Sequence, residues 1–121
     1  MNTDKLHALR DAHQCLHDAY KAASTRAREA QAEATRLRNL APTGSPEQKR
    51  MQARILARPL AELIDTPAPA LSVAGIDARY IKLIITAQRR ADALRLQAES
   101  QAPALRRSGL LIAQINEYAN V

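Results

Sequence analysis

The sequence predicts an all-α protein, a helical hairpin or bundle of three to four helices with a long coiled-coil-like helix at its N-terminus. Two observations carry this prediction. Over the first forty residues, apolar and small residues recur at alternating spacings of three and four, which is the pattern of a coiled-coil seam. The chain also has no Phe, no Trp and only three Gly among its 121 residues, so the aromatic residues and turn signals of a β-sandwich are missing. We therefore expect an aliphatic core rich in alanine.

The first predicted helix spans residues 4–41 and contains this seam. Its positions change from large residues to alanines and back to leucine: Leu6, Leu9, His13, Leu16, Tyr20, Ala23, Ala27, Ala30, Ala34 and Leu37. Because a row of alanines leaves voids unless another helix lies close, we expect the alanine section to pack tightly against a second helix. The periodicity leaves open whether that helix belongs to the same chain or to another copy. A homo-oligomer, with a dimer favoured, is the expected assembly.

Proline and glycine divide the rest of the chain. Residues 42–46 read Pro-Thr-Gly-Ser-Pro, which ends the first helix and starts a second at residues 46–64. Ser45 and Gln48 have the spacing of a capping box at the start of this helix. Pro59 lies inside it and is expected to kink it or to split it. So short a connection predicts that the first two helices form an antiparallel hairpin.

The C-terminal half is predicted to contain a linker and two helices. Residues 65–75 contain two prolines and are expected to form the linker. Helices at residues 76–101 and 104–119 follow, separated by Pro103. Residues 80–86 also have high β-propensity, so a strand is the alternative there. A helix is favoured because a single strand would have no partner. By length, residues 1–121 are expected to be one domain.

The charge balance favours an acidic partner. The chain has 18 Lys and Arg against 12 Asp and Glu, a formal net charge of +6. Such a surface attracts nucleic acid or an acidic protein face. The candidate contacts to carboxylates or phosphates are Arg36, Arg38, Lys49, Arg50, Arg54, Arg58, Arg89 and Arg90. The alternative is a solvated helix face balanced by nearby glutamates. Stacking platforms for single-stranded bases are missing, because the only aromatic residues are three tyrosines.

Side chains suited to catalysis or metal binding are sparse. The sequence contains no glycine-rich phosphate loop, no CxxC pair and no HExxH motif, so we expect no catalytic residues and no cofactor. His13 and His17 lie four residues apart, which is a spacing that zinc ligands use on a helix. Cys15 between them points to another face. Polar residues in or beside an interface are the simpler interpretation of both histidines, and we expect no metal site.

The composition of the chain also leads to broad expectations about its location and function. A single cysteine excludes an internal disulfide and favours a reducing compartment. The sequence contains no run of 18 apolar residues, so no membrane span is expected, and the polar N-terminus is unlike a signal peptide. We expect a cytoplasmic, self-associating, non-enzymatic interaction protein, such as a phage or mobile-element accessory protein, an adaptor or an inhibitor of a host protein. The alternatives are a sequence-nonspecific nucleic-acid-binding protein using Arg-rich helix faces, and a structural or assembly component of a phage.

Overall fold

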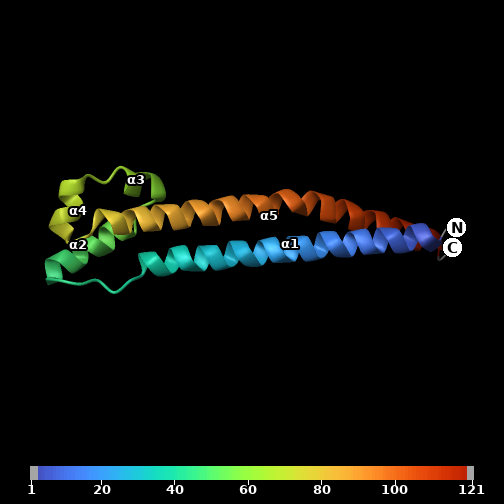
Figure 1. The fold of residues 1–121 in the computed structure, drawn as a ribbon, viewed down its shortest axis with the longest axis horizontal. Coiled ribbons are helices and arrows are strands. Elements are labelled where there is room, and N and C mark those ends of the chain that lie inside the picture. Colours follow the sequence, from blue (N-terminus) through green and yellow to red (C-terminus); the bar gives the residue numbers. More distant parts are fainter. Residues whose placement is uncertain (1–2, 120–121) are drawn as a thin grey trace. The chain divides into compact units, whose positions relative to one another are not determined.

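The chain is all-α, as predicted (Figure 1). The computed structural model describes the backbone of residues 3–119 and the side chains of residues 3–117, and it contains no strand among these residues. The helices are α1 (Thr3–Arg38), α2 (Pro46–Leu56), α3 (Leu60–Ile64), α4 (Ala68–Ala74) and α5 (Ala78–Ala119). Residues 80–86 lie inside α5, so the helical interpretation of that segment is confirmed and the strand alternative is wrong.

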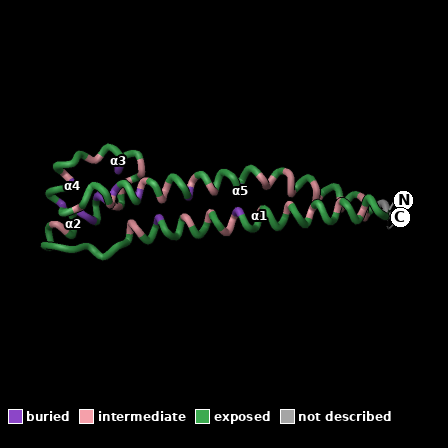
Figure 2. Tube along the Cα trace, in the orientation of Figure 1, coloured by how far each residue is buried: buried purple, intermediate pink, exposed green. Residues whose placement is uncertain are grey.

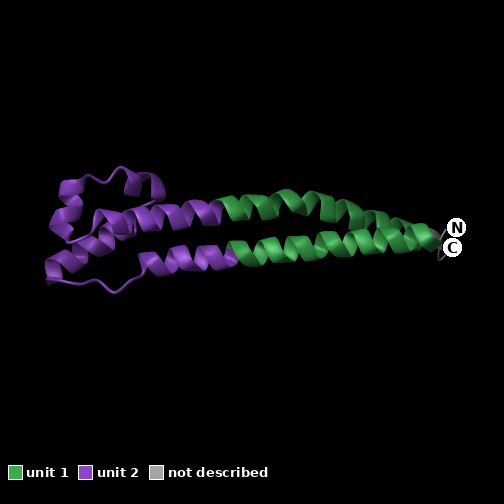
Figure 3. Ribbon diagram, in the orientation of Figure 1, with its two compact units in different colours: residues 1–27, 93–121 green, residues 28–92 purple. Residues whose placement is uncertain are grey.

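The contacts within the chain divide it into two compact units (Figure 3). Unit 1 consists of Met1–Ala27 and Ala93–Val121, and unit 2 of Arg28–Asp92. Each long helix therefore contributes one segment to each unit. The single domain expected from the chain length stays a prediction.

The predicted seam is the covered face of α1 (Figure 2). All ten seam residues are buried or half-buried, whereas Asp4, Asp11 and Asp18 on the opposite face are exposed. Ala23 in unit 1 is 2% exposed and Ala34 in unit 2 is 0% exposed. The helix is unbroken from Thr3 to Arg38 and ends three residues earlier than predicted. The alanine section is thus packed, as expected from the voids that small side chains would otherwise leave.

In both units the helix that covers the seam is α5 of the same chain. In unit 1 the His13 ring hydrogen-bonds to Ser108, and Arg10 Nη2 donates to Asn116 Oδ1 at 3.3 Å. In unit 2 Gln31 and Gln88 exchange amide hydrogen bonds of 3.0 and 3.3 Å. In unit 1 the earlier residue of α1 pairs with the later residue of α5, so the two segments are antiparallel there.

The predicted hairpin of the first two helices is wrong, because α5 takes the place expected for α2. In unit 2 the Tyr80 hydroxyl of α5 donates to the carbonyl oxygen of Leu37 near the end of α1. Together with the Gln31–Gln88 pair, this contact places α5 along α1 in antiparallel orientation. The helix α2 packs on α4 instead. The physical reason is length: residues 39–45 are long enough to carry the chain away from α1, and α2 has only 11 residues with which to cover it.

The start of α2 is as predicted, but the helix ends early. Ser45 Oγ accepts the Gln48 N–H at 3.2 Å and Gln48 Oε1 accepts the Ser45 N–H at 3.1 Å, which completes the capping box. Pro59 splits the predicted helix at 46–64, which is one of the two effects expected of it, and a separate α3 begins at Leu60. Pro59 lacks an N–H and disfavours the helical conformation of the preceding residue, so α2 stops before it.

The segment 65–75, predicted to be a linker, contains the helix α4. Pro67 and Pro69 occupy its N-terminal end, where a missing N–H removes no intrahelical hydrogen bond. Gly75 ends it with φ +73°, a left-handed conformation that favours glycine, and Ile76 N–H donates to Leu71 O at 2.9 Å. These prolines therefore start a helix here, whereas the linker prediction assumed that they exclude one.

The predicted helices 76–101 and 104–119 are one continuous helix. Asp77 Oδ1 accepts the Arg79 N–H at 2.9 Å and so caps the start of α5, and this hydrogen bond is the first cause of the lowered pKa of Asp77. Pro103 lies inside α5 and is exposed. A proline within a helix costs about 3 kcal/mol, so the break was a reasonable expectation. Its neighbours Ala102 and Leu105 are half-buried, so the apolar area covered on either side of Pro103 offsets part of this cost.

The core of unit 2 is aliphatic, as expected. It brings together residues from α2, α3, α4 and α5: Ile55, Leu63, Leu71, Ala74, Ile81 and Ile84. Leu63 and Ile84 are the two large side chains that are almost fully buried. The core anchors all three short helices to the first turns of α5. It therefore determines the surface that these helices present.

The Tyr80 side chain connects the first turns of α5 to the end of α1. Its ionisation is expected to lower the stability of the folded state at alkaline pH. Burial raises the pKa of its phenol above the ordinary value of 10.0. The folded state thus holds the proton more tightly than the unfolded state. Its contribution is fully present below about pH 10, where the unfolded tyrosine titrates, and is lost as the pH rises through the folded pKa.

We expect Tyr80→Phe to lower the free energy of unfolding by about 1 kcal/mol at neutral pH, because the Leu37 carbonyl loses its donor. The variant should also lose less stability than the parent between neutral pH and the alkaline side of about pH 10. Urea unfolding followed by circular dichroism measures both effects. An alkaline loss of equal size in parent and variant would contradict the role assigned to this phenol.

Candidate interaction surface

A groove lies between α2 and α4 in unit 2. It has a volume of about 400 Å³ and is lined by Met51, Arg54, Ile55, Arg58, Pro69, Ala70 and Val73. Ile55 is buried, whereas Met51 is 37% and Val73 is 61% exposed. The faces of α2 and α4 that line the groove therefore bury some apolar side chains and leave others exposed to solvent. The local signals that start both helices, a capping box for α2 and prolines for α4, determine where these side chains stand.

Gln52 attaches α2 to α4 and to the connection that precedes α2. Its side chain is 7% exposed, and it is the buried polar residue of the described chain. Its Nε2 donates to Ala74 O at 2.8 Å and to Thr43 O at 2.9 Å, and its Oε1 accepts the Thr43 N–H at 3.1 Å. Ala74 is in the last turn of α4, where carbonyls lack intrahelical partners. One amide therefore holds the two walls of the groove in register.

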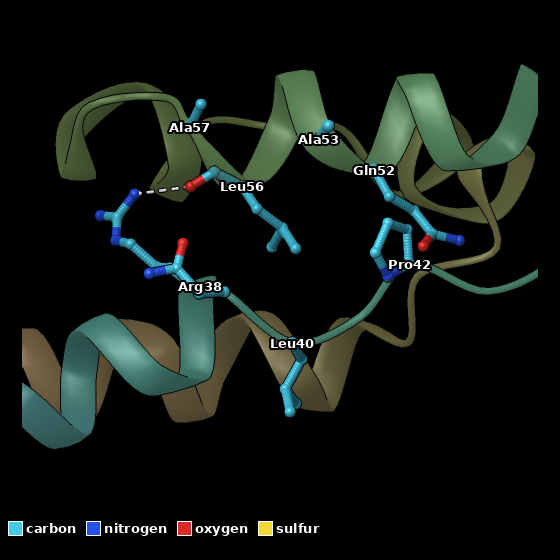
Figure 4. Close-up of a pocket in the computed structure, with 8 residues that line it drawn as sticks. Arg38, Leu40, Pro42, Gln52, Ala53, Leu56 and Ala57 are labelled. Carbon is cyan, nitrogen blue, oxygen red and sulfur yellow. Dashed lines mark hydrogen bonds between the residues drawn. The ribbon is translucent and has the colours of Figure 1, made fainter.

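A second hollow lies on another side of α2, next to the end of α1 (Figure 4). Its volume is about 290 Å³, and its lining includes Leu40, Pro42 and Leu56. Arg38 Nη1 donates to Leu56 O at 2.9 Å and to Arg58 O at 2.7 Å. The Arg38 guanidinium thus caps the carbonyl end of α2. Because its charge is used inside the chain, this hollow is a weaker candidate for binding an anion.

The eight basic residues predicted to contact an anionic partner separate into two groups. Arg36 and Arg38 have internal roles: Arg38 caps α2, and Arg36 forms two hydrogen bonds of 2.6 and 3.0 Å with the carboxylate of Glu33. The hydrogen bond from Arg36 also lowers the pKa of Glu33. The other six form no ion pair within residues 3–117: Lys49, Arg50, Arg54, Arg58, Arg89 and Arg90.

Four of these six unpaired residues lie on or just after α2. Lys49, Arg50 and Arg54 are exposed, and half-buried Arg58 places Nη1 at 3.4 Å from Thr66 Oγ1. The only acidic residue of this stretch is Glu47. The stretch therefore has an excess of positive charge beside the α2–α4 groove. Arg89 and Arg90 are exposed on α5 and do not line the groove.

The two histidines named as weak metal candidates have other surroundings in unit 1. His13 Nδ1 lies 2.6 Å from Ser108 Oγ, whose own proton is donated to Leu105 O at 3.0 Å. The His13 Nδ1 is therefore engaged in a hydrogen bond within unit 1. His17 is exposed, with Nδ1 at 3.6 Å from Asp18 Oδ1. Among the residues that the structure describes, no group of three or more His, Cys, Asp or Glu could hold a metal ion.

The sequence pattern missed the groove for two reasons. The helix α2 turns Gln52 and Ile55 inward and leaves Met51 at the rim, whereas the apolar residues alone would suggest that Met51 and Ile55 share a buried face. A glutamine in the middle of an apolar row was the signal that could have marked a buried polar contact. Val73 was placed in a linker, and only the formation of α4 turns it into part of a wall.

None of the helices in residues 3–119 is both long and apolar enough to cross a membrane. The chain matches no protein-family model, no curated protein and no solved structure.

Proposed function

We propose that this chain is a non-enzymatic interaction protein that binds an acidic partner through the basic surface of α2. The observation that carries the proposal is the group Lys49, Arg50, Arg54 and Arg58, which forms no ion pair with the described residues 3–117 and lies beside exposed apolar side chains. Arginine and methionine are enriched at protein interfaces, and a charge without an internal partner is available to an external one. Such a surface can bind an acidic partner without any catalytic side chain.

The test uses immobilised protein and charge reversal. Wild type, Arg50→Glu/Arg54→Glu and the matched control Arg89→Glu/Arg90→Glu are compared for proteins that they retain from a lysate of the natural host, quantified by mass spectrometry. Both double variants change the net charge equally, and all four side chains are exposed. We expect a partner that wild type and control retain and the α2 variant loses. Equal retention by all three proteins, or no specific retention, would contradict the proposal.

Nucleic acid is the second candidate partner. Arg50 and Arg54 are four residues apart on α2, a spacing that places both on one helix face where they can contact successive phosphates. If duplex DNA is the partner, log Kd should rise linearly with log salt, and Arg50→Glu/Arg54→Glu should lower this slope by about two. Fluorescence anisotropy of a labelled duplex measures the slope. Sequence-independent binding with this signature would favour nucleic acid over an acidic protein.

Self-association is part of the proposal, with a dimer as the expected assembly. In unit 1, α5 leaves three leucines between 45% and 65% exposed: Leu96, Leu110 and Leu111. Since the α1 seam is already covered by α5, these leucines are the apolar surface that a second copy would bury. Light scattering should then give twice the mass of the 13.3 kDa chain. A mass of one chain at every concentration would contradict self-association, and the basic surface of α2 would then belong to a monomer.

A cytoplasmic accessory protein, adaptor or inhibitor encoded by a phage or mobile element would combine these properties. It would be small, basic and without catalytic motifs, and it would act by occupying a surface of a host protein. A structural or assembly component of a phage particle is the remaining alternative. Copurification with assembled particles, and not with a single host protein, would favour that alternative.

A further inference from the structure

The structure assigns a partner chemistry to the α2–α4 groove: it accepts an apolar side chain from an acidic, amphipathic segment of a partner protein, with Arg54 and Arg58 bound to flanking carboxylates. This inference rests on the proposed interaction function and specifies the segment that would be recognised. The groove is a minor part of the surface, so the inference can fail while the broader function stands.

The apolar part of the groove is suited to one anchoring side chain. Five of its seven lining residues are apolar, and Ile55 forms a buried base between exposed Met51 and Val73. Its volume of about 400 Å³ is near the lower end of the range of about 300–1,000 Å³ found for ligand pockets. Methionine adapts its shape to different apolar partners, so Met51 at the rim tolerates different anchors. Burying Val73 would remove a branched apolar side chain from water.

The polar part of the groove selects for negative charge. Its two polar lining residues are Arg54 in the last turn of α2 and Arg58 just after the end of that helix. Within residues 3–117, neither of these two positive charges forms an ion pair with an acidic side chain. Arg58 uses Nη1 toward Thr66 Oγ1 at 3.4 Å, which leaves its other guanidinium N–H groups for a carboxylate. Asp or Glu residues beside the anchor would therefore complete the site.

A protein segment fits this groove better than a nucleic acid does. None of the lining residues is aromatic, so no side chain here would stack on a base. A phosphate backbone would contact the arginines and leave Met51 and Val73 uncovered. An acidic segment with an apolar anchor uses both kinds of side chain at once.

The first experiment follows Met51 directly. The chain contains two methionines, Met1 and Met51, so ¹³C-methyl labelling of methionine gives one groove signal, assigned by Met51→Leu. The probes are synthetic amphipathic peptides rich in Glu that differ only in one anchor residue, which is Leu, Phe, Met or Ser. A peptide with Lys in place of Glu is the charge control. We expect saturable shifts of the Met51 methyl signal with apolar anchors, about tenfold weaker binding with Ser, and no binding of the Lys peptide.

The second experiment uses matched variants in the same titration. Val73→Glu and Arg54→Glu should each weaken peptide binding by about tenfold or more, because one places a charge beside the anchor and the other reverses a contact. The controls Leu83→Glu and Arg90→Glu change exposed residues of α5 outside the groove; Leu83 is 58% exposed, close to the 61% of Val73. Both controls should bind within about twofold of wild type. Circular dichroism confirms that each variant is folded.

Three outcomes would overturn the inference. The first is an unmoved Met51 signal with every peptide, and the second is equal binding by Val73→Glu and wild type. The third is a shift produced by duplex DNA that Arg54→Glu abolishes and Val73→Glu leaves intact, which would assign the arginines to phosphates. A host partner lost with Arg50→Glu/Arg54→Glu but retained by Val73→Glu would preserve the proposed function and reject the groove. Failure of host capture by wild type would reject the broader function.

Discussion

Replacing Gln52 by leucine is expected to lower the free energy of unfolding by about 3 kcal/mol, since three hydrogen bonds worth about 0.5–1.5 kcal/mol each are lost. The leucine keeps most of the volume but leaves the Thr43 N–H, the Thr43 carbonyl and the Ala74 carbonyl without the partner they have now. None of these three groups has an intrahelical alternative, because Thr43 lies between α1 and α2 and Ala74 is the last residue of α4. Denaturant unfolding followed by circular dichroism measures the loss.

The control for this variant is Gln97→Leu on the exposed face of α5, where the glutamine side chain is open to solvent. We expect its stability to lie within about 0.5 kcal/mol of the parent. A second readout is the Met51 methyl signal, which should shift in Gln52→Leu because α2 and α4 lose their register. Equal stability of Gln52→Leu and the parent would show that α2 is held on α4 by apolar contacts alone.

Replacing Ala34 by leucine is expected to destabilise the protein by about 3 kcal/mol. Ala34 lies in the α1 seam of unit 2 and is 0% exposed, so the added carbons have no space. Overpacking of a close-packed core costs about 1–3 kcal/mol, and a site between two helix backbones belongs to the upper end of that range. The helices would have to separate, which also strains the Tyr80 contact to Leu37. The same denaturant titration measures this effect.

Ala32→Leu is the matched control, because Ala32 lies two residues away on the exposed face of α1. Alanine and leucine have similar helix propensities, so a difference between the two variants reports packing and not helix formation. The control should stay within about 0.5 kcal/mol of the parent. If Ala34→Leu were equally harmless, the alanine section would border open space, and the account of the seam would fail.

The basic residues show how tertiary contacts change the meaning of a charge pattern. All eight candidates looked equivalent as positively charged residues on helices. In the structure Arg38 makes a tertiary contact that closes the carbonyl end of α2, and Arg36 pairs locally with Glu33 one turn earlier in α1, so two of the eight have partners within the chain. Those near the α2–α4 groove form no ion pair within residues 3–117. Folding therefore determines which of the eight basic residues belong to the proposed binding surface.

Local interactions along the chain determined what could be predicted from the sequence. The seam of α1, the capping box of Ser45 and Gln48 and the stop before Pro59 all depend on residues within one or two helical turns. Their physical chemistry is present in any short stretch of the chain, because hydrogen-bond caps, side-chain spacing and proline geometry need no distant partner. The all-α class follows from the same local preferences.

Only the tertiary structure decided which segments pair and which side chains become surface. The partner of α1 is α5, which continues through Pro103, because burial of apolar area between segments far apart in sequence outweighs the local cost of proline. The helix α4 gains its buried face from Leu71 and Ala74 packing in unit 2. Tertiary packing also buries Gln52, whose side chain hydrogen-bonds to Thr43 and Ala74, and it makes Met51 and Val73 part of the groove lining. These outcomes depend on free energies summed over distant contacts, which a local pattern does not contain.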